Sequence, residues 1–268
     1  MNAFLLSNFA PMKTLLNLIR HRQSATQLLF YCGVIHLLLA LFFLILLPFE
    51  NRVVLGINLW IKPLKFALSI AIYSLTWVVL LGYIEGEKIK KYFVKFTVFA
   101  MSFEMLCVAT QAARGELSHF NQTGTHNIIL YALMGIVIVL QTIFSLVLSI
   151  WFFKPLSSAL PETMIWAIRL GLLISIFFAF QGGFIGQRMA HTVGAPDGGQ
   201  GIWFFNWSIK HGDLRIAHFF GLHALQLLPA FVWIFRIKNK VPVIFFGVFY
   251  FVFVSLLFYY ALLGNGFA

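Results

Sequence analysis

The chain has 268 residues, of which 61% are hydrophobic and only 10% are charged, and its mean hydropathy is +0.91. Soluble domains carry about 25% charged residues, so this composition excludes a soluble globular protein and indicates a multi-pass membrane protein in contact with the lipid bilayer. The formal net charge of +11 does not indicate a nucleic-acid partner, because no basic domain with interleaved aromatic residues is present.

Seven apolar stretches are long enough to cross a membrane as helices. About 20 residues span roughly 30 Å of hydrocarbon as a helix, and none of the stretches alternates as the strands of a membrane barrel do. The sequence therefore predicts an all-α bundle of seven transmembrane helices, with residues 1–268 forming a single domain. The predicted spans are 27–48, 64–84, 93–113, 127–151, 163–185, 214–236 and 241–263.

The distribution of basic residues predicts the orientation of the bundle. Lys13, Arg20 and Arg22 precede the first span, and the loops after the second, fourth and sixth spans also carry lysine or arginine. Because basic loops stay on the cytoplasmic side, we expect a cytoplasmic N-terminus and an extracytoplasmic C-terminus.

The second span carries a polar stripe. A helix turns about 100° per residue, which places Lys62 and four further polar residues within an arc of about 80°. Anchoring at the membrane surface explains the lysines, but it explains the deeper hydroxyl groups less well. The stripe consists of Lys62, Lys65, Ser69, Tyr73 and Thr76.

The third span holds Glu104 about halfway across the membrane. An ionisable carboxyl group at this depth is energetically costly, and such groups usually face a cavity or the bundle interior. A protonated carboxyl that only packs against a neighbouring helix is the structural alternative. Gln111 and Arg114 follow toward the outer end, as Gln181 and Arg188 do on the fifth span.

The long loop 186–213 is the largest connection between spans. Its Pro196–Gly199 segment indicates a turn, and its tryptophan and phenylalanine side chains suit either a segment on the membrane surface or a lid over the bundle. We expect the histidines of the shorter outer loop, His119 and His126, to be solvated.

The sixth span begins with the segment RIAHFFGLHALQ. Arg215, His218, His223 and Gln226 fall within an arc of about 140° and should face inward. The two histidines are five residues apart, unlike the three- or four-residue spacing that lets one helix grip one metal ion. His218 is therefore expected to join the outer basic residues.

Placed by depth, the polar residues form a funnel that opens outward above a floor of His36, Glu104 and His223. The floor residues are candidate ligands for a transition metal, and His36 and His223 are candidate axial ligands for haem b. The residues expected to bind the cofactor or ligand are His36, His223, Lys62, Lys65, Gln111, Arg114, Gln181, Arg188, Arg215 and Gln226.

Three functions fit this arrangement. A membrane-embedded haem or metal redox protein is the first, and a transporter or receptor for a small anionic molecule is the second, because the funnel has an excess of positive charge. The third is a lipid-modifying enzyme with Glu104, His218 or His223 as the acid or base. A purely structural subunit of a larger complex is a fourth alternative.

Four segments of the sequence resemble segments of a known protein family. They are WIKPLKFALSIAIYSLTW, QAARGELSHFN, HTVGAPDGGQG and GDLRIAHFFGLHALQ. In these segments the chain resembles a bacterial family of multi-pass membrane proteins with no known function. The resemblance, which runs from about residue 56 to 230, implies the bacterial inner membrane and carries no activity, cofactor or site residue.

Overall fold

The computed structural model describes residues 25–156 and 160–267, and it confirms an all-α architecture with seven helices long and apolar enough to cross a membrane. The protein is therefore an integral membrane protein with several spans. The helices are α3 (Ala25–Leu46), α4 (Ile61–Leu81), α5 (Glu87–Arg114), α6 (Gly124–Ser149), α7 (Glu162–Arg188), α8 (Leu214–Ile234) and α9 (Lys240–Leu262).

The helices differ from the predicted spans mainly at their ends. Helix α5 begins at Glu87 rather than at residue 93, because its first turns are charged and hydropathy marks only the apolar part of a helix. Helix α4 begins at Ile61, with Pro63 in its first turn, where the missing N–H leaves no helical hydrogen bond unmade. Lys13, Arg20 and Arg22 lie outside the described residues, and the orientation in the membrane remains a prediction.

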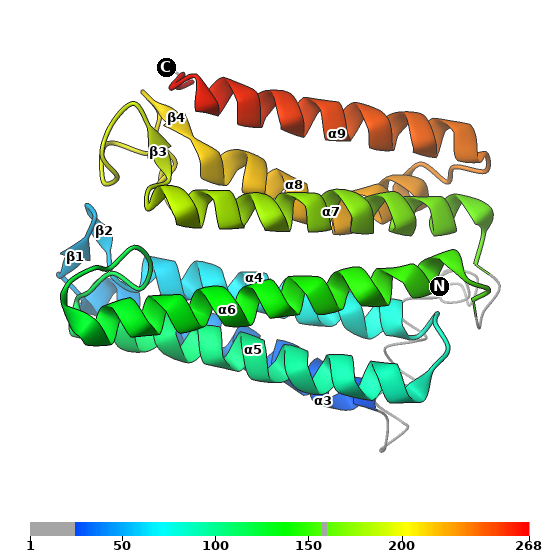
Figure 1. The fold of residues 1–268 in the computed structure, drawn as a ribbon, viewed down its shortest axis with the longest axis horizontal. Helices are drawn as coiled ribbons and strands as arrows, with labels where there is room; N and C mark the ends of the chain where they lie inside the picture. Colours follow the sequence, from blue (N-terminus) through cyan, green and yellow to red (C-terminus); the bar gives the residue numbers. More distant parts are fainter. Residues whose placement is uncertain (1–24, 157–159, 268) are drawn as a thin grey trace, which may run out of the picture.

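The helices form two groups that lie one above the other (Figure 1). Helices α3 to α6 make the lower group, in which α3 packs against α4 and α5, and α5 packs against α6. Helices α7 to α9 make the upper group, where the contact between α7 and α8 is the most extensive. Helix α6 packs against α7, and the 3-10 helix η2 (Ile150–Phe153) connects α6 toward α7.

Close approach of α7 and α8 depends on a glycine. A Cβ atom added to Gly221 of α8 would lie 2.1 Å from the Phe178 side chain of α7, so a side chain here would push the helices apart. Since lipid tails are as apolar as leucine, membrane helices associate through such tight packing and through hydrogen bonds between helices. The glycine therefore explains the close packing of α8 against α7.

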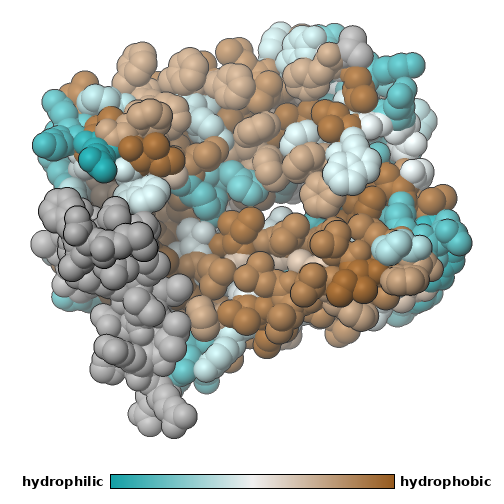
Figure 2. All heavy atoms as spheres, turned by 180° about the vertical axis from the view of Figure 1, so that it is seen from behind, coloured by the Kyte–Doolittle hydropathy of each residue, from teal (hydrophilic) through white to brown (hydrophobic). Residues whose placement is uncertain are grey.

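The two groups meet between α4 and α8. Leu225 of α8 joins the apolar cluster formed by Trp77 of α4 and its neighbours, and Gln226 Nε2 donates to Thr76 Oγ1 at 3.0 Å. Seen from behind, hydrophilic side chains lie in a hollow between the two groups, with apolar surface above and below (Figure 2). The polar faces of α4 and α8 thus lie toward each other, in agreement with the inward direction predicted for both.

The two ends of the bundle differ in structure. Connections 47–60, 115–123, 189–213 and 263–267 form one end, which we call the loop end. It contains two small antiparallel sheets, β1 (Val53–Val54) with β2 (Ile57–Asn58), and β3 (Thr192–Val193) with β4 (Gly212–Asp213). Residues 82–86, 150–156, 160–161 and 235–239 form the opposite end, which we call the basic end.

Candidate anion-binding site

The loops of the loop end contact one another across the two helix groups. The β1–β2 hairpin turns at Leu55 and Gly56, both with positive φ. A Cβ atom on Gly56 would lie 3.4 Å from the carbonyl oxygen of Gly198, in the Pro196–Gly199 turn of the long loop. The β1–β2 hairpin of the lower group therefore contacts the long loop that precedes α8.

Asp213 anchors the start of α8. Its buried carboxylate accepts from the backbone N–H of Arg215 (3.0 Å) and of Ser208 (2.7 Å), so it caps the helix and holds the long loop. The Arg215 guanidinium donates to the same carboxylate through Nε (2.9 Å) and also to the carbonyl oxygen of Asn206. The arginine therefore lies in the first turn of α8, pointing at the loop.

A second cation reaches the neighbouring carbonyl of the same loop. Lys65 of α4 donates through Nζ to the carbonyl oxygen of Phe205 at 3.0 Å. The Phe205 ring stacks on Trp207, with centroids 4.4 Å apart, and lies edge-on to Phe219 of α8 at 5.5 Å. Residues 201–208 thus form a lid, which Lys65 and Arg215 hold from opposite helix groups.

Lys62 lies one turn before Lys65 and contacts the shorter outer loop. Its Nζ lies 3.3 Å from His119 Nδ1, and because an ammonium group has only donors, the imidazole nitrogen accepts. Burial and the charge of Lys62 lower the pKa of His119 well below 6.5, so the ring is neutral at pH 7. The lysine therefore has a neutral partner.

Neither Lys62 nor Lys65 is paired with an acid. The ion pairs of the described residues all involve other cations. Both side chains are partly buried, and Arg215 repels both of them as a like charge, whereas Asp197 and Glu104 attract Lys62 and Asp213 attracts Lys65. Since none of these acids lies within ion-pair distance of Lys62 or Lys65, neither ammonium group beneath the lid has a directly bound counter-ion.

A histidine–aspartate pair lies beside this cluster. His191 Nδ1 lies 2.7 Å from Asp197 Oδ2, and because an ionised carboxylate only accepts, the nitrogen carries the proton. Asp197 also accepts from the backbone N–H of His191 (3.1 Å) and of Thr192 (2.8 Å). The carboxylate therefore fixes the ring and leaves Nε2 of His191 as a free base.

The protonation states of this pair follow from its surroundings. Burial lowers the pKa of His191, and the hydrogen bond to Asp197 only partly opposes this effect. Burial disfavours the charge on Asp197, yet the hydrogen bonds from His191 and Thr192 hold the pKa of Asp197 below its usual range. At pH 7 the pair is a neutral imidazole oriented by a carboxylate. The charges of Arg215 and Lys62 also act on His191.

Glu104 lies deeper in the lower group. Its side chain is buried, and Oε1 has no hydrogen-bond partner. Lys62 is close enough for the charges to interact. The carboxyl group therefore faces the interior below the cationic cluster, as predicted for an ionisable group at this depth.

The predicted floor residues do not form one ligand group. His36 belongs to α3, which packs against α4 and α5, whereas His223 belongs to α8, which packs against α7 and α9. Within residues 25–156 and 160–267, no group of three or more His, Cys, Asp and Glu side chains could hold a metal ion. The structure thus does not bring all three together, because His36 and Glu104 are on α3 and α5, which pack against each other, whereas His223 is on α8 in the other helix group.

The histidines of α8 point in different directions. His218 Nδ1 lies 2.7 Å from the carbonyl oxygen of Phe178, so this ring packs against α7. His223 Nδ1 lies 2.7 Å from the carbonyl oxygen of Phe219 one turn earlier, and its ring lies 4.1 Å from the Phe219 ring. Gln226 contacts α4 instead. The arc of about 140° on α8 therefore faces both α7 and α4.

Four predicted binding residues have structural partners away from the cluster. Gln111 Nε2 donates to the carbonyl oxygen of Leu117 and to Asn127 Oδ1, and these bonds hold the short outer loop. Arg114 forms an ion pair with Glu116, and both side chains are partly exposed. The other two belong to α7. Gln181 donates to the carbonyl oxygen of Leu214, and Arg188 lies over the Phe184 ring.

The structure adds three residues to the candidate site: His119, His191 and Asp197. They lie on loops, where the sequence shows no helical periodicity. A histidine six residues before an aspartate in the turn HTVGAPDGG was a usable signal for the pair. The partner of His119 could not be predicted from the sequence, because Lys62 is 57 residues away in the chain.

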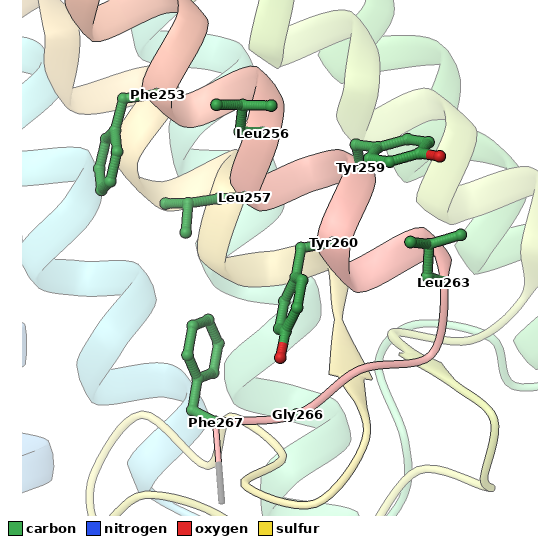
Figure 3. A pocket seen from close by; sticks show the side chains of 8 residues that line it. All are labelled: Phe253, Leu256, Leu257, Tyr259, Tyr260, Leu263, Gly266 and Phe267. Carbon is green, nitrogen blue, oxygen red and sulfur yellow. The ribbon is translucent and has the colours of Figure 1, made fainter.

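One surface pocket lies elsewhere, between α9 and the C-terminal residues (Figure 3). Phe253, Tyr260 and Phe267 are among its lining residues, and none of the lining residues is charged. Such a lining suits lipid chains rather than a charged ligand. The loop-end cluster therefore remains the candidate site.

Comparison with known proteins adds no assignment: no protein-family model, curated protein or solved structure matches the chain.

Proposed function

We propose that the protein binds a small anionic group, a carboxylate or a phosphate, under the lid at the loop end. The observation that carries this proposal is the pair of acid-free ammonium groups, Lys62 and Lys65, beside Arg215. We further propose that the loop end faces away from the cytoplasm of a bacterial inner membrane, since the basic end carries Lys88, Lys91, Lys154, Arg236 and Lys238.

The energetics favour an anion over a purely structural role. A partly buried ammonium group loses hydration, and neutral acceptors such as a carbonyl or an imidazole only partly replace it. Hydrogen bonds between charged partners are roughly twice as strong as neutral ones. An anion between Lys62, Lys65 and Arg215 would therefore give the two ammonium groups the charged hydrogen-bond partner that they lack.

The lid gives the site a means of opening. Lys65 and Arg215 hold the carbonyl groups of Phe205 and Asn206, and an entering anion would compete for the same donors. Binding would therefore release residues 201–208 or reposition them. A protein with such an exchange can act as a receptor or, if the interior also opens, as a transporter in which Glu104 carries a proton.

A haem or metal redox function has less support. Such a function would need its ligands to line one cavity, whereas His36 and His223 lie on helices with different neighbours. The described residues also contain no group of three or more His, Cys, Asp and Glu side chains that could hold a metal ion. A visible absorption spectrum and elemental analysis of the purified protein test this alternative directly.

A lipid-modifying or phosphate-ester-cleaving enzyme is a second candidate, favoured by the His191–Asp197 pair. A neutral imidazole oriented by a carboxylate is suited to act as a general base, and the nearby cations would hold the anionic part of a substrate. The histidine of this candidate is His191, rather than the predicted His218, whose ring packs against α7.

Calorimetric titration of the purified protein with inorganic phosphate and with succinate tests the main proposal. Lys65→Gln should weaken binding about tenfold or more, the loss expected for one charge-assisted hydrogen bond. Lys210→Gln is the matched control, because Lys210 is exposed at the same end. Binding of neither anion to the wild type, or equal loss in both variants, would contradict the proposal. Flux of a bound anion in proteoliposomes distinguishes a transporter from a receptor.

A further inference from the structure

We infer that the hollow between α4 and α8 is a lateral entrance, and that the anion bound at the loop end is the headgroup of a lipid whose chains stay in the bilayer. This inference rests on the proposed anion site and specifies the class of its ligand. It commits to a lipid-borne anion rather than to a soluble one.

Polar side chains line the hollow at membrane depth. Ser69 of α4 is exposed, and three further residues are only half-buried: Thr76, His223 and Gln226. Ser69 lies about 12 Å along α4 from its start at the loop end, and His223 lies about 14 Å along α8. These side chains are therefore within the hydrocarbon region, although they remain accessible on the protein surface.

Exposed polar groups at this depth need a polar environment. Hydrocarbon offers no hydrogen bonds, and polar residues in membrane spans normally face a cavity or a partner. Gln226 and Thr76 satisfy each other, but they leave Ser69 without a described hydrogen bond. The hollow therefore offers hydrogen-bonding groups to water or to the polar part of a ligand.

The hollow leads to the cationic cluster. Lys65 lies one helical turn before Ser69, so the two side chains share a face of α4. On the facing helix, Phe219 lies one turn before His223 and contacts the lid residue Phe205. A molecule in the hollow would thus meet positive charge at the loop end, which selects an anionic headgroup.

The walls beside the hollow suit acyl chains. Ile72 of α4 and Leu227 of α8 are exposed apolar side chains next to the polar stripe, and apolar surface borders the hydrophilic patch on both sides (Figure 2). A molecule with an anionic head and apolar chains fits all three features: the cations, the polar hollow and the apolar walls.

Binding of three probes to the full chain in detergent tests this inference: dihexanoyl phosphatidic acid, dihexanoyl phosphatidylcholine and inorganic phosphate. We expect phosphatidic acid to bind at least tenfold more tightly than either of the others. Ser69→Phe, which fills the hollow, should weaken phosphatidic acid binding at least tenfold and leave phosphate binding unchanged. Leu106→Phe, at an exposed apolar residue of α5, which does not border the hollow, is the matched control and should change neither.

The outcomes separate this inference from the proposed function. Phosphate binding that is lost in Lys65→Gln, together with no preference for phosphatidic acid or no effect of Ser69→Phe, overturns the lipid inference and leaves the anion site intact. Absence of binding by any anionic probe overturns the proposed function itself.

Labelling of Ser69→Cys gives a second measurement that does not depend on a bulky substitution. The two native cysteines are buried, so a polar maleimide should modify the new thiol selectively. We expect dihexanoyl phosphatidic acid to protect this thiol and phosphatidylcholine not to protect it. Labelling without protection, or a disulfide-linked dimer through Ser69→Cys, would show that water or a second copy occupies the hollow and would overturn the inference.

Discussion

The two ends of the bundle use the same basic residue types in opposite ways. At the basic end, Lys90 pairs with Glu87 and Lys240 with Glu162, on largely exposed carboxylates. At the loop end, Lys62 and Lys65 are partly buried and have only neutral partners. Surface pairs contribute little to stability, and basic residues at this end agree with the membrane orientation proposed above. The second set lacks that explanation and indicates a binding site.

The largest expected effect tests the anchor of the loop end. Asp213→Ala should lower the free energy of unfolding by about 3 kcal/mol, because it leaves the partly buried Arg215 without its acid and removes the cap of α8. Asp213→Asn should lower the free energy of unfolding by less, since an amide oxygen can still accept from the backbone N–H of Arg215. Apparent melting temperatures in detergent measure the difference. A change no greater in the alanine variant than in the asparagine variant would contradict this role.

Lys62 should affect binding and stability in opposite directions. Lys62→Gln should weaken phosphate binding about tenfold, whereas stability should rise by about 1 kcal/mol, because a partly buried and acid-free ammonium group is removed. Titration calorimetry and thermal unfolding of the same sample give both values. Lys154→Gln at the basic end should change neither. Reduced stability with unchanged binding would make Lys62 a structural residue.

The pH dependence of stability should also come from the loop end. The pKa values of His119 and His191 lie below 6.5 in the folded protein, so the unfolded chain binds more protons once the pH falls below about 6.5. The apparent melting temperature should therefore fall between pH 7.5 and pH 5.5. A double His119→Gln, His191→Gln variant should show a smaller fall. An equally steep fall in this variant would place the responsible groups elsewhere.

The smallest effect is expected at the basic end. Glu162→Ala breaks the ion pair with Lys240, but both side chains are largely exposed, at 63% and 45%. We therefore expect no measurable change in melting temperature at physiological salt. Anion affinity should also be unchanged. A clear loss of either would remove the distinction between the two ends.

Much of the fold was predictable, but only part of the site was. Hydropathy located all seven helices, and helical periodicity placed the stripes of α4 and α8 on faces that meet through Thr76 and Gln226, although Ser69 of the α4 stripe is exposed. It did not identify partners: Gln111 hydrogen-bonds within the short outer loop, and His218 packs against α7. The loop residues His191 and Asp197 were not selected, because loops have no period from which to infer direction.

By itself, the sequence determined how many helices are long and apolar enough to cross a membrane, and how far along its helix each polar residue lies. These properties depend on transfer from water to hydrocarbon and on the fixed geometry of a helix, which are local. Only the tertiary structure decided that Lys62 contacts His119, that Lys65 and Arg215 hold one lid, and that His36 and His223 face different neighbours. Partner choice depends on how distant segments pack, and residues equal in depth can therefore belong to different sites.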